Sequence, residues 1–149
     1  MAAVTSVFRA QQIFLARIDG VLRPLGLTFA RYEVLMLLMF SRAGALPLNK
    51  VGARLQVHPT SITNAVGRLV EQDLIARVPH PTDGRTTLAE ITAAGRRLAE
   101  KATAAVNAEV FATPGLDPGD VGTLIEVLGQ LRRDAGDFEG GASPSGSTW

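Results

Sequence analysis

The sequence predicts a mainly α-helical fold with one small β-hairpin. Three observations predict it. Apolar residues recur at helical spacing before and after the middle of the chain. Between them, VPHPTDGRTTLAEIT at 78–92 carries two prolines and a DG pair flanked by strand-like residues, which marks a tight turn between two strands. Finally, 46% of the 149 residues are hydrophobic, ample for a core in one domain with two sub-parts.

Two helices are predicted at the start of the chain. Residues 6–23 carry apolar side chains that recur close to every seven residues, and Pro24 ends the run. Thr28 is placed as the N-cap of a second helix at 29–42. This helix contains VLMLLMF, so burial on most sides is expected, but the run is too short to span a bilayer.

Two further helices are predicted before the hairpin. Pro47 fits the first turn of a third, short helix that ends at Leu55. Residues 57–59 form a turn, and Thr60 or Ser61 then caps a fourth helix with the sequence TSITNAVGRLVEQ.

The hairpin and two helices complete the chain. Strands are predicted at 74–78 and 87–91, and Thr92 then caps a fifth helix that reaches about Phe111. The pair at 117–118, Asp then Pro, opens a sixth helix. Its apolar stripe consists of Val121, Leu124, Ile125, Leu128 and Leu131. A short helix, a tight turn, a second helix and a hairpin together make a winged helix-turn-helix.

The fourth helix has two contrasting faces. At 100° per residue, the apolar side chains of Ile62, Val66, Leu69 and Val70 fall in one sector. Opposite lie small hydroxyls, an amide, a glycine and two charges: Thr60, Ser61, Asn64, Gly67, Arg68 and Glu71. Such a face suits a DNA major groove, where Asn pairs with adenine and Arg with guanine. The alternative is a solvated amphipathic helix with Thr and Ser as caps, but the neighbouring elements favour DNA recognition. The predicted contacts on this helix are Thr60, Ser61, Thr63, Asn64 and Arg68.

The hairpin tip carries Arg85, where polar filler is usual. A hairpin beside a recognition helix reaches the flanking minor groove, whose negative potential favours an inserted guanidinium. We expect Asp83 to hold that guanidinium by a charge-assisted hydrogen bond and Gly84 to let the turn bend. The alternative is a solvated turn arginine paired with its neighbour.

Charge is unevenly distributed along the chain. Residues 1–49 carry five Arg against two acidic residues, and residues 50–97 carry seven basic against four acidic residues, so each segment is +3. Residues 98–149 carry three basic and eight acidic residues, a net −5. This pattern fits a polyanion-binding face beside a region kept away from the polyanion.

The composition argues against several other functions. The chain has no cysteine, which excludes disulfides and thiol sensing, and only two histidines, so no metal site or cofactor is expected. Glu33, Glu71 and Glu90 lie in different elements, and neither His58 nor His80 belongs to a nucleophile motif, so no enzyme is expected. His58 is expected to cap a turn or meet phosphate, and His80 to lie on the hairpin. No signal peptide is recognised, which suggests a cytoplasmic protein without membrane association.

Three stretches carry a resemblance to a known family. LTFARYEVLMLL, LNKVGARLQVHPTSITNAVGRLVEQDLI and ARVPHPTDGRTTLAEITAAG resemble the second helix, the helix-turn-helix and the wing of the MarR family, the multiple antibiotic resistance regulators. The resemblance runs from about Leu27 to Gly95. Three positions depart from the family pattern: Gly84-Arg85 replaces Arg-Arg, Asp73 stands where Gly is usual, and Ala76 stands where a basic residue is common.

The resemblance implies a homodimeric transcription regulator, usually a repressor, that binds double-stranded DNA at a pseudo-palindromic operator. Residues 1–27 and 98–138 would form dimerisation helices, 28–97 the DNA-binding domain, and the Gly/Ser-rich residues 139–149 a disordered tail. The apolar stripes at both chain ends also predict a dimer, because they have no evident partner within the chain. A small aromatic or phenolic effector would bind between the two regions and release the DNA. The pocket candidates are Phe8, Phe14, Arg17, Tyr32 and Phe40. The competing hypothesis is a winged-helix module for protein–protein contact with no operator of its own.

Overall fold

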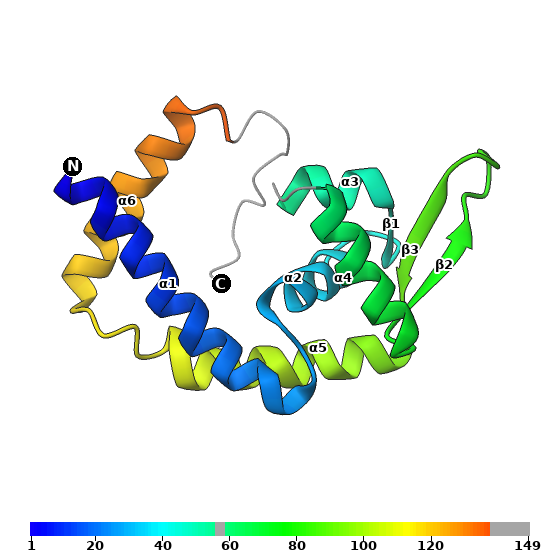
Figure 1. Cartoon of the computed structure of the whole chain (residues 1–149), viewed down its shortest axis with the longest axis horizontal. Helices are drawn as coiled ribbons and strands as arrows, with labels where there is room; N and C mark the ends of the chain where they lie inside the picture. Colours follow the sequence, from blue (N-terminus) through cyan, green and yellow to red (C-terminus); the bar gives the residue numbers. More distant parts are fainter. Residues whose placement is uncertain (56–58, 138–149) are drawn as a thin grey trace. The chain divides into compact units, whose positions relative to one another are not determined.

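The computed structural model describes residues 1–55 and 59–137, with the remaining residues drawn as a grey trace in Figure 1. The turn expected at 57–59 lies mostly outside the described residues, as does the tail expected at 139–149. The chain forms two compact units, Met1–Ala112 and a second unit that begins at Thr113. The first unit contains the three strands of the described residues and all the elements of the predicted winged helix-turn-helix.

The first helix, α1, spans Ala2–Leu22 and therefore begins four residues earlier than predicted. The error has a simple cause: the N-cap residue, Met1, makes no side-chain capping bond, so no local signal marks the start. A 3₁₀ turn over Arg23–Leu25 follows and includes the proline predicted to end the helix. Only the C-terminal part of α1 enters the core, through Ile18 and Leu22.

The second helix, α2, spans Phe29–Met39 and is the centre of the core. The predicted N-cap is confirmed, since the Thr28 side chain accepts a hydrogen bond from the Arg31 backbone N–H at 3.4 Å. The predicted burial on most sides is also confirmed, with Val34, Leu35 and Leu38 fully buried. The helix nevertheless ends three residues earlier than predicted.

The sheet has three antiparallel strands: β1 spans Ala45–Pro47, β2 spans Ile75–Pro79 and β3 spans Thr87–Ile91. Strand β3 lies between the other two, in the order β1-β3-β2. The predicted β2–β3 hairpin is confirmed, but β1 was missed. Pro47 was expected in the first turn of the third helix, and instead it ends β1, while α3 spans Leu48–Leu55. A strand of three residues gives no periodic signal, and it forms because it pairs with β3, more than 40 positions along the chain. Proline is tolerated there because β1 is an edge strand.

The fourth helix, α4, spans Pro59–Glu71 and ends in a left-handed residue, Asp73, with φ of 55°. The Asp73 N–H donates to the Val70 carbonyl and the Leu74 N–H donates to the Leu69 carbonyl, which closes the helix end. This geometry explains why glycine is usual at the position, because a Cβ at positive φ is strained. The link between α4 and the wing therefore contains a residue with a strained backbone, Asp73.

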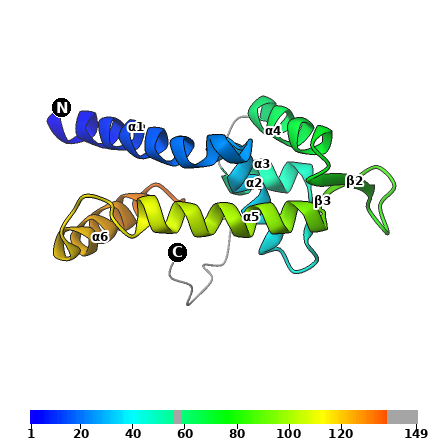
Figure 2. The same cartoon turned by 90° about the horizontal axis from the view of Figure 1, so that it is seen from below.

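The fifth helix, α5, spans Ala93–Val106 and continues into a π-helical turn, Asn107–Phe111. Its predicted cap is confirmed, since the Thr92 hydroxyl accepts from the Gly95 N–H at 3.0 Å. A Cβ at Gly95 would lie 2.2 Å from the Leu74 carbonyl oxygen, so only glycine fits this approach of α5 to the start of β2. In Figures 1 and 2, α5 runs beside α1 and α2, and the hairpin extends beyond the helices of the first unit.

The second unit contains α6, Pro118–Asp134. The Asp-Pro pair opens this helix as predicted, with Asp117 as the N-cap residue, although the Asp117 side chain makes no capping hydrogen bond. None of the α6 residues is buried, and its apolar stripe is largely open, with Ile125 67% and Leu131 60% exposed. No helix in the described residues is long and apolar enough to cross a membrane.

Candidate nucleic-acid interface

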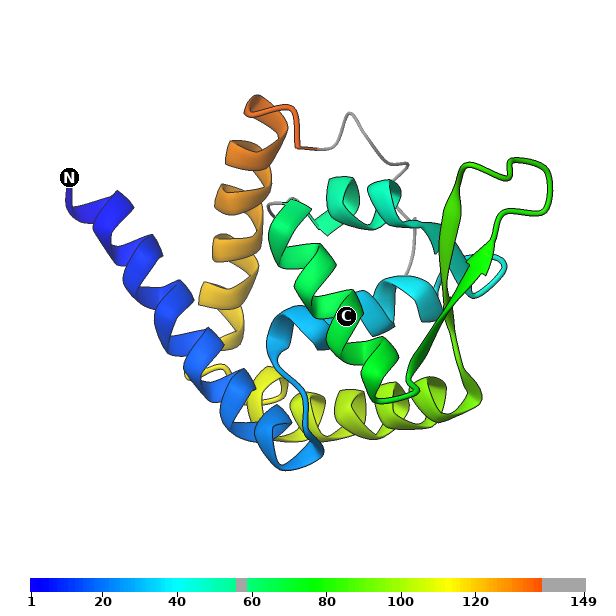
Figure 3. The ribbon, with the colours of Figure 1, turned by 45° about the vertical axis from the view of Figure 1, so that its right-hand side comes forward.

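Helix α4 is held by its apolar face and presents its polar face. It packs against α2, α3 and β2 (Figure 3). Val66 and Leu69 are fully buried and Ile62 is nearly so, in agreement with the predicted sectors. The predicted contact residues on this helix are all exposed: Thr60, Ser61, Thr63, Asn64 and Arg68. The apolar anchoring thus fixes which side chains face outward.

The first turn of α4 differs from the prediction. The helix begins at Pro59, so Thr60 and Ser61 lie within the first turn and neither is the N-cap. Proline is favoured there because its missing N–H and fixed φ suit the first helical position. The two hydroxyls remain at the N-terminal end of the helix, where backbone N–H groups and the helix dipole attract phosphate. The role expected for His58 lies outside the described residues.

One ion pair lies on the exposed face of α4. The Arg68 Nη1 atom donates to Glu71 Oε2 at 2.9 Å. Both side chains are largely solvated, at 72% and 64% exposure. The guanidinium predicted to read a base is therefore already partnered by a carboxylate one helical turn away.

The hairpin tip is held by its own side chains. The His80 N–H donates to the Thr86 carbonyl at 3.0 Å, and the His80 Nδ1 atom accepts from the Thr82 N–H at 3.3 Å. Asp83 Oδ1 accepts from the Arg85 backbone N–H at 3.1 Å, and Oδ2 accepts from the Thr86 hydroxyl at 2.7 Å. His80 is thus a structural part of the turn.

The expected bond between Asp83 and the Arg85 guanidinium is wrong. An Asp side chain readily accepts hydrogen bonds from a backbone N–H two residues later and from a hydroxyl three residues later. These bonds form within the turn and do not require a long arginine side chain to become ordered. These bonds lower the pKa of Asp83, first through the Thr86 hydroxyl and then through the Arg85 N–H, with a smaller contribution from His80. Among the described residues, none forms an ion pair with the exposed Arg85 side chain.

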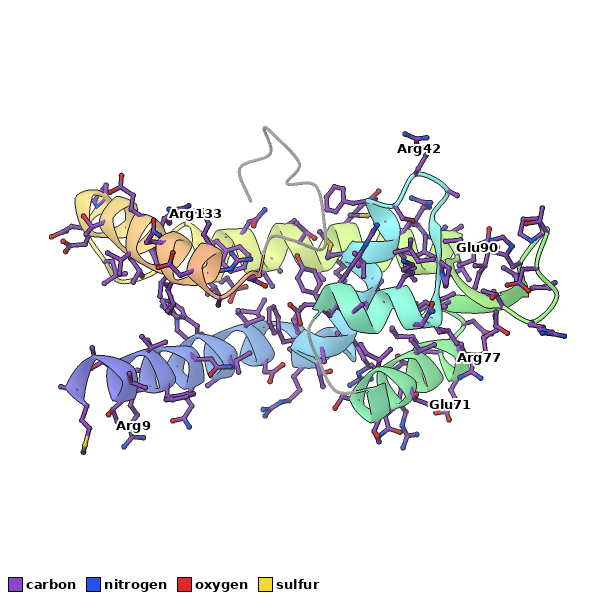
Figure 4. All side chains as sticks on the ribbon, turned by 90° about the horizontal axis from the view of Figure 1, so that it is seen from above. Arg9, Arg42, Glu71, Arg77, Glu90 and Arg133 are labelled. Carbon is purple, nitrogen blue, oxygen red and sulfur yellow. The ribbon has the colours of Figure 1, made fainter. Side chains whose placement is uncertain are left out.

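Arg77 is a cation that sequence reasoning did not assign to the interface. It lies exposed on β2, two residues after the buried Ile75 and therefore on the same face of the sheet. Figure 4 shows Arg77 on the same side as Glu71 of α4, with Glu90 on the opposite side. The alternation of Ile75, Arg77 and Pro79 was the available signal, but it gains meaning only once α4 is known to pack beside β2.

The five pocket candidates lie in different surroundings within one chain. On α1, Phe8 is 60% exposed, whereas Phe14 and Arg17 are half-buried. Phe40 is the C-cap residue of α2 and is 64% exposed. Tyr32 alone is buried, and its hydroxyl lies 3.0 Å from Thr103 Oγ1 of α5. The five side chains thus differ widely in exposure, and Tyr32 is the buried one among them.

Two observations bear on other chemistry. Burial raises the pKa of Glu33 on α2. Within the described ranges, no group of three or more His, Asp or Glu residues is placed to hold a metal ion.

A helix-turn-helix with an exposed polar recognition helix and an adjacent arginine-tipped wing defines a winged-helix transcription regulator. A profile of the MarR family matches residues 25–86. Sco5413, a MarR family transcriptional regulator from Streptomyces coelicolor, is 51% identical, with a TM-score of 0.85 and coverage of 93% of this chain and 96% of that one. The chain belongs to the MarR family of transcriptional regulators, which are DNA-binding proteins and not enzymes.

Two more distant relatives have informative names. The HTH-type transcriptional repressor Mb2911 of Mycobacterium bovis is 29% identical over 102 residues, which cover 68% of this chain and 72% of the relative. CouR from Rhodococcus jostii RHA1, solved bound to p-coumaroyl-CoA, is 28% identical with a TM-score of 0.72, covering 84% of this chain and 87% of that one.

Proposed function

We propose that the chain is a homodimeric repressor that binds a pseudo-palindromic operator through α4 and the wing. The observation that carries the proposal is the exposed polar face of α4, held rigid by its buried apolar face, next to an arginine-tipped hairpin. In this proposal α4 enters the major groove and the wing reaches the flanking minor groove. Residues 28–97 form the DNA-binding part, and 1–27 with 98–138 the dimerisation part.

The proposed dimer rests on apolar surface at both ends of the chain. Residues 2–13 of α1 are all exposed and include Val7, Phe8 and Ile13. The exposed stripe of α6 adds Ile125 and Leu131, and burial of such surfaces against a second copy would remove them from water. Two-fold symmetry would then place the two α4 helices roughly 34 Å apart on successive turns of DNA.

The dimer is tested by sedimentation and by charge insertion on α6. Leu128→Asp should give a monomer that no longer binds a palindromic operator at micromolar concentration. Thr123→Asp, on the same helix but at a polar position, is the matched control and should remain dimeric. A parent chain that sediments as a clean monomer would remove this part of the proposal.

Base reading is tested on DNA selected by the parent chain from a randomised duplex pool. Asn64→Ala and Arg68→Ala should each weaken binding to the selected duplex by roughly 1–3 kcal/mol and to a scrambled duplex by much less. An equal loss on both duplexes would mean that these side chains touch only phosphate. A pool that shows no enriched sequence would favour a winged-helix module without an operator.

The regulatory part of the proposal is repression that a small aromatic or phenolic ligand relieves in the cytoplasm. The name of the mycobacterial relative supports repression, and the acyl-CoA bound to CouR supports a ligand with a phenolic group. In the proposed site, residues of both parts contribute, among them Phe8, Phe14, Arg17, Tyr32 and Phe40. Titration of a parent–operator complex with a panel of phenolic acids and their CoA thioesters should find a compound that releases the DNA. Tyr32→Phe should then shift the releasing concentration, and a panel with no active member would count against a phenolic effector.

A further inference from the structure

The ion pair on α4 places a negative charge on the face proposed to meet DNA. Glu71 lies on the exposed face three residues after Arg68, and its Oε2 accepts from Arg68 Nη1 at 2.9 Å. An acidic side chain at this position opposes binding to phosphate, so a helix selected only for affinity would not carry it. The carboxylate therefore requires an explanation other than attraction to DNA.

The pair has little to do with folding. Both side chains are mostly solvated, and exposed pairs three residues apart on a helix contribute little to stability. The buried residues of α4 lie on the opposite side, so neither charge supports the core. Loss of the Glu71 carboxylate should consequently leave the fold intact.

The pair does restrict the guanidinium. A free arginine at 72% exposure samples many rotamers and can reach phosphates on either side of the groove. The guanidinium has five N–H donors in a fixed planar arrangement. The contact with the Glu71 carboxylate uses some of them and leaves others to face a guanine edge. It also lowers the guanidinium's net attraction for phosphate, because the pair is neutral as a whole, whereas hydrogen bonds to a base edge depend less on net charge.

A second cation lies on the same side of the first unit as this ion pair but does not share the carboxylate. Arg77 of β2 lies on the same side as Glu71 in Figure 4, yet within the described residues the ion pair of Glu71 is with Arg68. Arg77 therefore stays available for the DNA backbone, and Glu71 acts on Arg68. The two arginines thus have different electrostatic surroundings at one interface.

We propose that Glu71 is a specificity-determining positioning residue, which holds Arg68 for a base edge and against capture by phosphate. The inference rests on the proposed function, since it requires DNA recognition by α4. Glu71 acts through Arg68 and need not touch the DNA itself. It raises the ratio of selected to non-selected affinity, while it costs part of the total electrostatic attraction.

The experiment uses the full-length chain, the duplex that this chain selects from a randomised pool, and a scrambled duplex of the same composition. Glu71→Gln removes the charge and keeps the shape. The ratio of the two affinities should fall about three- to tenfold, with binding to the scrambled duplex unchanged or tighter. Glu90→Gln is the matched control, because it removes one exposed carboxylate on the opposite side of the hairpin (Figure 4) and should leave the ratio unchanged. Equal thermal midpoints for the three proteins would establish that folding is unaffected.

A second background shows whether Glu71 acts through Arg68. In an Arg68→Ala chain, Glu71→Gln should no longer change the affinity ratio, because the group it positions is absent. If Glu71→Gln leaves the affinity ratio unaltered in the chain that retains Arg68, the proposal is overturned. The same fall with and without Arg68 would also overturn it, because it would indicate a general charge effect. Failure of the parent chain to enrich any sequence would be a failure of the proposed function and is recognised before any variant is made.

Discussion

Helix α4 and the wing, the two regions proposed to bind DNA, differ in what fixes their conformation and in whether their exposed arginine is paired. Helix α4 owes its orientation to buried residues such as Val66 and Leu69, and its outward cation Arg68 is paired with a carboxylate. The wing tip extends beyond the core and owes its shape to short bonds within the turn, from Asp83 to the Arg85 N–H and the Thr86 hydroxyl. No described residue forms an ion pair with the outward cation Arg85.

The difference separates stability from recognition. In α4 the same thirteen residues form part of the core and part of the surface, so many substitutions disturb both. At the wing tip the side chains bury little, so substitutions there change DNA binding with little effect on unfolding. Under the proposed function, the helix would supply selectivity, because buried residues fix its orientation and Arg68 is paired with Glu71. The wing would add affinity, because the exposed Arg85 could enter a groove of negative potential.

The largest effect on stability is expected from the buried side of α4. Leu69 is fully buried, and Leu69→Ala should lower the free energy of unfolding by about 2–5 kcal/mol through lost burial and a residual cavity. Denaturant unfolding measures it. The wing counterpart, Pro81→Ala, is exposed and should change the unfolding free energy by less than about 0.5 kcal/mol. Similar losses from both variants would break the contrast between the two regions.

The wing should give the largest effect on binding without an effect on folding. Arg85→Ala should weaken operator binding about tenfold or more and lower the slope of log affinity against log salt by about one unit. Arg85→Lys should recover only part of the loss, since a lysine is more strongly hydrated. Asp83→Ala should cost less than Arg85→Ala, because it loosens the turn and leaves the cation in place. Operator binding by Arg85→Ala that matches the parent across a salt series would mean that the wing does not contact DNA.

A smaller effect on stability is expected at Asp73, which links α4 to the wing. Asp73 adopts φ of 55°, which glycine reaches without steric cost. Asp73→Gly should therefore raise the free energy of unfolding by about 0.5–1 kcal/mol, somewhat less than the full left-handed cost because Asp tolerates this conformation. Thermal unfolding of the variant beside the parent checks it. Gly95→Ala is the opposing control and should destabilise, because its Cβ would meet the Leu74 carbonyl.

The smallest effect is a local pH dependence at the wing tip. Hydrogen bonds to the Asp83 carboxylate depress its folded-state pKa below the ordinary value of 3.8. The stabilisation of the turn is therefore present above pH 3.8 and is lost as the pH falls through the lower, folded-state pKa. The carboxyl ¹³C shift of Asp83, followed by NMR, should titrate below 3.8, and Thr86→Val should move the midpoint upward because it removes the first of these bonds. A midpoint at or above 3.8 would mean that the turn does not form as described.

Local chemistry determined much of what sequence reasoning predicted correctly. The two faces of α4 follow from a 3.6-residue period, and the caps at Thr28 and Thr92 follow from hydroxyls placed just before helical runs. The hairpin followed from prolines and a DG pair between strand-like residues. The family could be recognised from the same segments, because they carry its motifs.

Pairing between distant segments decided the remainder. Strand β1 exists because β3 offers it a partner, so its three residues carry no sufficient signal of their own. Arg77 lies on the same side as Glu71 of α4 because α4 packs beside β2. Asp83 has two classes of partner in reach, and the folded turn brings the N–H and hydroxyl closer than the guanidinium. The sequence shows which groups are neighbours along the chain. Only the packed structure determines which of the available groups form a given hydrogen bond or pair with a given strand edge.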